Sequence, residues 1–154
     1  FTFDPDYKNA AGVAQFLTGT PPILSLAVLD SALDIFTDIT ITDINRKANA
    51  LAELFLDLVT NDKDLHCLAL ESKADSALRG TQLAFSHADA YAISRALNKA
   101  RVVVDFRSPD IIRFGFSPLF LRFEDIWRAT QIIKEIVKEK TYLADEFSQK
   151  LKVT

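Results

Sequence analysis

The 154-residue chain contains no methionine and a single cysteine, Cys67. One cysteine excludes an intrachain disulfide and is typical of a reducing compartment, so we expect a cytoplasmic location. No run of about eighteen apolar residues occurs and no signal peptide is visible, which argues against a membrane span or export. Because methionine is absent and the chain opens with FTFDPDYKN, we expect the sequence to be a segment of a longer protein.

Positive charge and glycine are also in short supply. The chain has 18 Lys and Arg against 21 Asp and Glu, which gives a formal net charge of −3. Such a chain lacks the basic surface that binds nucleic acid or an anionic membrane, so we expect neither as a partner. The four glycines are too dispersed to form a phosphate-binding loop; they are Gly12, Gly19, Gly80 and Gly115.

Residues that commonly carry metal or hydrolytic chemistry do not form a recognisable motif. His66 and Cys67 are adjacent, so on a strand their side chains would point to opposite faces, and His87 lies twenty residues beyond Cys67. The sequence contains no CxxC, HxxxH, HExxH or GxSxG. We therefore expect no metal site and no self-contained hydrolase, and we interpret His87 as a strand-end residue bonded to the backbone.

What the chain does have is a large apolar content, at 49% hydrophobic and 25% charged residues, with twelve Phe. This composition is typical of one globular domain with a well-filled core. Apolar residues recurring three and four apart indicate helices, and short alternating or unbroken apolar runs indicate strands. The expected helices are 23–39, 40–61, 88–100, 123–140 and 142–150, and the expected strands are 65–72, 81–87, 101–106 and 111–116.

This order of elements predicts an α+β fold, in which a small sheet of short strands is covered on one face by helices and preceded by a long helix. We expect a hairpin across Ser108–Pro109, and burial of Val102–Val104 on both faces of the sheet. Residues 1–20 are expected to be an irregular segment leading from a large domain outside this chain, and 21–154 to form the small α+β domain.

Two positions stand out as candidate sites. In TGTPPIL, Thr20 is a plausible helix N-cap before two prolines, and a hydroxyl at a helix start is also a potential phosphate or carboxylate site. Arg113 lies between Ile112 and Phe114 in an apolar strand, where a guanidinium needs an anionic partner. That partner could be a ligand carboxylate or an internal acid, with Asp105, Asp110, Glu124 and Asp125 as the candidates.

Three stretches give the chain a family resemblance. FLTGTPPILSLAVLDSALDIF, RGTQLAFSH and VVVDFRSPDIIRFGFSPLFLRFEDIWRAT occur in the order found in the C-terminal part of kynureninases, and together they extend over nearly the whole chain. The DFR, IRFGF and SPLF elements favour this family over other relatives of the class V aminotransferases. The resemblance implies the small domain of a fold-type-I enzyme that depends on pyridoxal phosphate and acts as a homodimer on L-kynurenine, giving anthranilate and L-alanine.

Carried over by position, Arg113 matches the arginine that holds the substrate α-carboxylate. Thr20 matches the residue before the Pro-Pro pair that reaches the cofactor phosphate, usually across the dimer interface. Phe120 stands where tyrosine is also expected in the family, and it is expected near that arginine in a packing role. The resemblance supplies no residue for catalysis within this chain.

The chain departs from the family pattern in one large respect. The lysine that carries the cofactor and most of the other cofactor ligands belong to a region that precedes this segment, and no lysine of the chain has a matching context. We therefore expect the chain to be inactive by itself and to bind no cofactor. Two alternatives stay open: a non-catalytic dimerisation or interaction module, and the small domain of another class V aminotransferase-like enzyme.

Overall fold

The structure is a computed structural model, and it describes residues 5–149. The backbone contacts divide the chain into two compact units, with the boundary between Thr40 and Ile41, and each unit is described by itself. The boundary expected at residue 20, between a lead-in and the small domain, stays a prediction. Residues 1–4 of that lead-in and Lys150 of the last expected helix lie outside the described residues.

The first unit consists of short helical segments with almost no buried surface. A 3-10 turn at Gly12–Phe16 precedes helix α1 (Ile23–Leu33), which continues into a 3-10 turn at Asp34–Phe36. The expected helix over 23–39 is confirmed in its first two thirds. Helix α1 is apolar on every side, as its sequence ILSLAVLDSAL indicates, and none of its residues is buried.

The predicted N-cap of α1 is wrong. The helix begins at Ile23, so Pro22 occupies the N-cap position and makes no side-chain cap hydrogen bond. Both prolines therefore precede the first helical turn, and Thr20 lies too far upstream to bond to that turn. Proline tolerates this position because its fixed φ suits a helix start and it has no N–H to satisfy.

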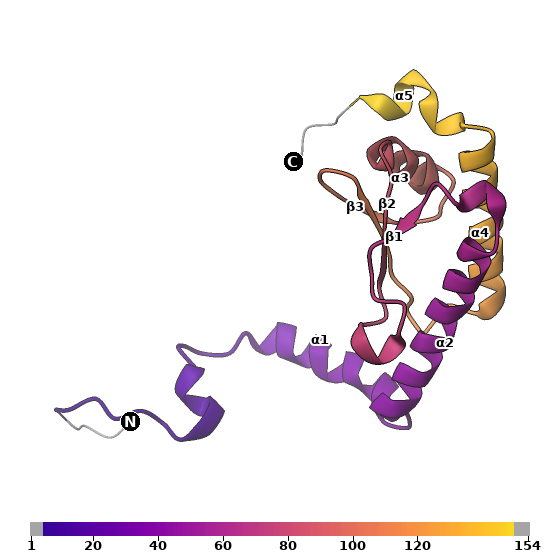
Figure 1. Cartoon of the computed structure of the whole chain (residues 1–154). Helices are drawn as coiled ribbons and strands as arrows, with labels where there is room; N and C mark the ends of the chain where they lie inside the picture. Colours follow the sequence, from indigo (N-terminus) through magenta and orange to yellow (C-terminus); the bar gives the residue numbers. More distant parts are fainter. Residues whose placement is uncertain (1–4, 150–154) are drawn as a thin grey trace. The chain divides into compact units, whose positions relative to one another are not determined.

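The second unit is built on a four-stranded antiparallel sheet with the order β1-β2-β4-β3. Figure 1 shows the sheet beside the helices of this unit. Its strands are short: β1 (Ala69–Leu70), β2 (Leu83–Ser86), β3 (Asp105–Arg107) and β4 (Ile111–Phe114). Strands β3 and β4 form the expected hairpin across Ser108–Pro109. Strand β4 is central, pairing with β2 on one side and with β3 on the other.

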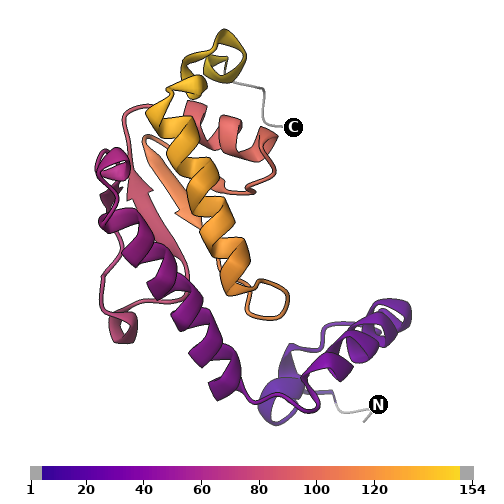
Figure 2. The same cartoon turned by 90° about the vertical axis from the view of Figure 1, so that its right-hand side faces the viewer.

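Helices cover one face of this sheet, which confirms the expected α+β class. Helices α2 (Ile41–Thr60) and α4 (Phe123–Lys138) pack side by side across it, and α3 (Ala90–Lys99) packs against β3, β4 and α4 (Figure 2). Alternate strand residues, Leu83 and Phe85 in β2 and Ile112 and Phe114 in β4, are buried toward the helices. The 3-10 turns at Lys63–Leu65, Ser76–Leu78 and Thr141–Leu143 and the short helix α5 (Asp145–Ser148) complete the unit.

The centre of the core is a cluster of phenylalanine rings. Phe55 of α2 lies 4.8 Å from Phe114, 5.3 Å from Phe116 and 6.0 Å from Phe85, measured between ring centroids. These rings come from a helix, two strands and the segment after β4, so the cluster joins the helical layer to the sheet. These four Phe residues thus form an aromatic interior, as expected, whereas other Phe residues such as Phe120 are exposed.

Three local predictions are wrong. Val102–Val104 is not a buried strand, since β3 begins only at Asp105 and Val103 is 86% exposed. Strand β1 covers two residues of the stretch predicted over 65–72, because Leu65 belongs to a 3-10 turn. We also expect the apolar spacing of 123–140 to put Trp127 on the buried side of its helix, but Trp127 is 53% exposed. Among the described helices, none is long and apolar enough to span a membrane.

Candidate carboxylate site

The site is centred on Arg113, whose side chain lies on the sheet face opposite the helices. Because neighbouring strand residues point to opposite faces, burial of Ile112 and Phe114 in the core directs Arg113 away from it. Its side chain is 29% exposed, so part of it is accessible to solvent. The apolar neighbours that made Arg113 conspicuous in the sequence are therefore the strand residues that face the core, and Arg113 itself faces the other way.

The anionic partner of Arg113 is Asp105, which lies directly opposite in the β3–β4 hairpin. Arg113 Nε donates to Asp105 Oδ2 at 2.7 Å, and Nη2 donates to the same oxygen. Of the four acids that the sequence left open, the structure selects this one. The three-residue loop between Arg107 and Ile111 places position 105 opposite position 113.

A second arginine shares the same carboxylate. Arg107 Nε donates to Asp105 Oδ2 at 3.0 Å, so one oxygen accepts three N–H groups from two guanidinium groups. The hydrogen bonds from Arg113, with a contribution from the charge of Arg107, lower the pKa of the Asp105 carboxyl below its usual value. Asp105 is therefore ionised at neutral pH, and it offsets one of the two positive charges beside it.

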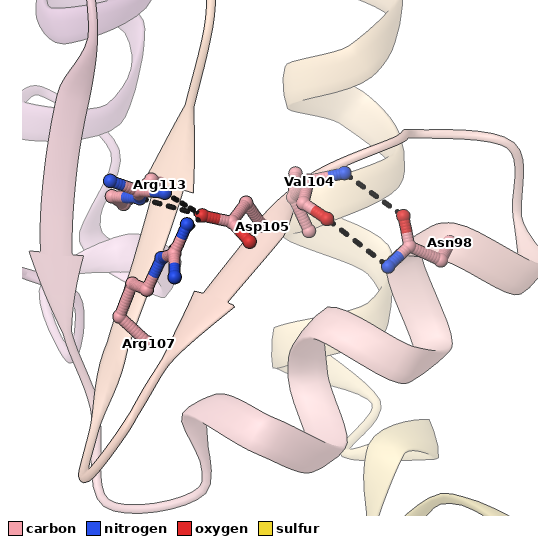
Figure 3. A network of polar contacts seen from close by, with 5 residues as sticks. All are labelled: Asn98, Val104, Asp105, Arg107 and Arg113. Atoms are coloured by element: carbon pink, nitrogen blue, oxygen red, sulfur yellow. Dashed lines mark hydrogen bonds and ion pairs between the residues drawn. The ribbon is translucent and has the colours of Figure 1, made fainter. Parts of the chain in front are cut away.

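Sequence reasoning missed Asn98, at the end of α3. Its Nδ2 donates to the carbonyl oxygen of Val104 at 3.2 Å, and its Oδ1 accepts from the Val104 N–H at 2.9 Å (Figure 3). Both bonds go to the residue immediately before Asp105. The side chain thus replaces the strand pairing that was expected for Val102–Val104. No pattern in the sequence marks such a contact between a side chain and a distant backbone.

Thr20 belongs to the first unit, where its side chain is exposed. Within the described chain its hydroxyl makes no hydrogen bond, because the helix that it was expected to cap begins three residues later. The first N–H groups of α1 are likewise unpaired until Leu26, which donates to the Pro22 carbonyl. A free hydroxyl next to a helix start is suited to donate to an anionic ligand.

Phe120 lines a cavity of about 560 Å³ rather than packing into the core. The side chain is 73% exposed, and its neighbours in the cavity wall include Val103, Leu121 and Ile132. Arg113 does not contribute to this wall. The expectation that Phe120 packs beside the arginine is thus not supported by its surroundings.

The remaining chemical candidates behave as structural residues. His87 Nδ1 accepts a hydrogen bond from the Asp89 backbone N–H at 2.9 Å, as interpreted from the sequence. Cys67 is an exposed free thiol. Among residues 5–149, no group of three or more His, Cys, Asp or Glu side chains is arranged to hold a metal ion.

Comparison with known proteins places the sequence of this chain in a family. The family model for the kynureninase C-terminal domain matches residues 44–133, which is 90 of the 154 residues and includes most of α2, all of α3, the whole sheet and Arg113. The chain belongs to the kynureninase C-terminal domain family. Helix α1 and Thr20 lie outside the matched range, so the match to the family model lies within the second unit.

Whole-chain relatives extend the similarity to both units. The chain is 38% identical over all 154 residues to a kynureninase of Pseudomonas fluorescens, and 35% identical to kynureninases of Burkholderia mallei and Burkholderia pseudomallei. It spans 37% of the length of each of these relatives. The kynureninase resemblance seen in the sequence is thereby confirmed.

Proposed function

We propose that this chain is the small C-terminal domain of a kynureninase-type hydrolase. In the intact protein it would help to cleave L-kynurenine with water, giving anthranilate and L-alanine, in a cytoplasmic homodimer that uses pyridoxal phosphate. The observation that carries this proposal is a partly exposed arginine on a strand paired on both sides, within a chain that aligns along its full length with kynureninases.

Arg113 is the residue proposed to bind the substrate. Its planar guanidinium can hold an α-carboxylate through two parallel hydrogen bonds, which fixes the orientation of the amino acid as well as its position. Orientation matters because the reacting bonds must be aligned before the reaction proceeds. A strand paired on both sides restricts the backbone of Arg113 more than a loop would, so the bound carboxylate is held in one place.

Thr20 is proposed to contribute to cofactor binding. The residues present fit pyridoxal phosphate in part. The Thr20 hydroxyl is free to donate to a phosphate oxygen, but no described lysine has a context that would hold the cofactor ring. When bound, the cofactor supplies an electron sink for cleavage of bonds next to the amino-acid α-carbon. Since its main ligands lie outside this chain, we expect the isolated chain to be inactive.

The test replaces Arg113 with lysine in the intact protein. Arg113→Lys keeps the charge but loses one arm of the bidentate contact, so we expect KM to rise and kcat to fall together. A charge-assisted hydrogen bond contributes about 1.5–3 kcal/mol, which corresponds to a loss of about 10- to 150-fold in kcat/KM for kynurenine. The measurement is the rate of anthranilate release.

Arg128→Lys is the matched control, because Arg128 forms an exposed ion pair with Glu124 within α4. Its kinetics should remain within about twofold of the unmodified protein. Unchanged kinetics of Arg113→Lys would show that Arg113 forms only a structural ion pair with Asp105 and does not bind the substrate. Absence of anthranilate release by the unmodified intact protein would reject the kynureninase assignment.

A non-catalytic interaction module is a second candidate, and exposed apolar helix α1 is the observation that favours it. The sequence encoded in frame upstream of Phe1 distinguishes the two candidate functions. A large domain bearing the cofactor lysine supports the enzyme, whereas an unrelated upstream region supports the module.

A further inference from the structure

We propose that Asp105 is a positioning residue for Arg113, and that Asn98 holds Asp105 in place. This inference rests on the proposed role of Arg113 as the substrate-carboxylate ligand. It assigns a task to the network of Figure 3, in which both arginines face the carboxylate of Asp105 and the Asn98 amide faces Val104.

The first argument is geometric. Asp105 bonds to Nε and Nη2 of Arg113, which together form one edge of the planar guanidinium. The opposite edge, formed by Nη1 and the second hydrogen of Nη2, has no partner within the described residues. A carboxylate bound at that free edge would receive two parallel N–H bonds, while Asp105 fixes the plane in which those bonds point.

The second argument is electrostatic. Arg107 and Arg113 together carry two positive charges and Asp105 carries one negative charge, so the three side chains have a net charge of +1. An incoming carboxylate is therefore attracted to the group despite the acid beside Arg113. Asp105 Oδ2 already accepts three N–H groups, so its ionised form is stabilised in place.

The third argument concerns rigidity. Asp105 is the first residue of an edge strand, a position at which a backbone is weakly restrained. The two hydrogen bonds from Asn98 fix the backbone of Val104 to the end of α3, one residue before Asp105. On the other side of Asp105, Phe106 packs edge-on against Tyr91 of α3 at 5.3 Å between ring centroids. Asp105 is thus anchored from both neighbours in the chain.

The kinetic test uses Asp105→Asn in the intact protein. If Asp105 positions Arg113, the freed guanidinium must be ordered on binding, which raises KM for kynurenine about 2- to 12-fold with kcat within about twofold. Asn98→Ala should raise KM in the same direction by a smaller factor. If the substrate instead displaces Asp105, the substitution removes a competitor and KM falls, which would overturn the proposal, as would an unchanged KM.

Two control variants and a pair of inhibitors distinguish the loss of Arg113 positioning from a general distortion of the domain. Asp62→Asn removes a carboxylate bound to Lys134, and Asn61→Ala removes an exposed side-chain amide bonded to Asp57. Both should leave KM unchanged. A competitive inhibitor with an α-carboxylate should bind Asp105→Asn more weakly, whereas its carboxamide analogue should bind both proteins equally. Equal weakening of both inhibitors would indicate distortion of the domain and overturn the proposal.

A spectroscopic test does not depend on activity. In the 154-residue chain, the Nε–Hε group of Arg113 should give an NMR signal protected from solvent exchange, because Nε donates to Asp105 at 2.7 Å. The protection should disappear in Asp105→Asn and decrease in Asn98→Ala. If the intact protein does not cleave kynurenine but this pattern is found, the assigned function fails while the positioning stands. Equal protection in all three proteins would reject the positioning itself.

Discussion

Among single residues, Asp105 is the one whose ionisation is tied most directly to the candidate site. Arg113 and Arg107 lower the pKa of its carboxyl, with the hydrogen bonds from Arg113 as the larger cause. A group whose pKa is lower in the folded protein stabilises the fold above its unfolded pKa of about 3.9. That contribution is lost as the pH falls through the folded value.

We therefore expect Asp105→Asn to change the pH dependence of stability. At pH 7 the substitution should lower the free energy of unfolding by up to about 1 kcal/mol, since the pair is partly exposed and screened by water. As the pH falls below about 4, the protonated Asp105 loses the same interaction, so the two proteins should converge. Urea denaturation at a series of pH values measures this. A difference that stays constant from pH 7 to pH 2 would contradict it.

Phe55 is the residue on which the core depends most. Its ring contacts Phe85, Phe114 and Phe116, and its side chain is almost completely buried. We expect Phe55→Ala to lower the free energy of unfolding by about 3–5 kcal/mol, because it removes apolar burial and leaves a cavity. Phe120→Ala is the control, since the exposed Phe120 should change stability by no more than about 0.5 kcal/mol. Urea denaturation distinguishes the two.

At the scale of elements, the helices were easier to predict than the strands. Helix α2 buries Ala48, Leu51, Phe55 and Val59 on the face that its spacing indicates. The Val102–Val104 run failed because strand pairing depends on neighbours far away in the sequence, and here Asn98 bonds to the backbone in place of a strand. Burial on both faces also requires a layer on each face of the sheet, and the described helices pack on one face.

The candidate site was predictable in part, because only some of its features leave a local signal in the sequence. Alternation in β4 is a local signal, so Arg113 could be singled out from its apolar neighbours. The identity of its partner depends on the length of the hairpin loop, which the sequence left open between adjacent registers. The anchoring by Asn98 was not predictable, because it joins a helix end to a backbone position six residues later with no sequence motif.

Helices α1 and α2 should differ in backbone stability, although α1 has the larger share of apolar residues. Helix α1 has 11 residues and none is buried, whereas α2 has 20 residues and packs against α4. Isolated helices of fewer than about 12–15 residues are marginal in water. We expect α1 amides in the 154-residue chain to exchange with solvent nearly as fast as in an unfolded peptide, and the central α2 amides to be protected. Equal protection, measured by hydrogen exchange, would contradict this.

For the whole molecule, the main physical property of the chain is the apolar surface of its first unit. Leu24 and Val28 of α1 are 84% and 71% exposed, and Ile23, Leu29 and Leu33 are also exposed. Contiguous apolar surface of this kind favours association in water. The chain spans 37% of the length of its kynureninase relatives, and in a longer protein such surface can be buried by other parts of the chain.

We expect the isolated 154-residue chain to self-associate, with a light-scattering mass above that of a monomer at high concentration. Leu24→Lys with Val28→Lys places two charges on one face of α1 and should shift the population toward monomer. Gln131→Lys with Gln149→Lys adds the same charge at exposed polar positions and should leave the association unchanged. A clean monomer of the unmodified chain would contradict the prediction.

The alternation in β4 also has a consequence for folding accuracy. If the β3–β4 hairpin formed one residue out of register, Arg113 would replace Ile112 or Phe114 in the layer that faces the helices. Burying an unpaired guanidinium there costs several kcal/mol, which adds to the cost of turning the buried Ile112 and Phe114 toward solvent. An apolar replacement of Arg113 would remove the first of these penalties and narrow the free-energy gap between the two alignments. The arginine proposed to recognise a substrate thus also helps the chain to reach one hairpin alignment.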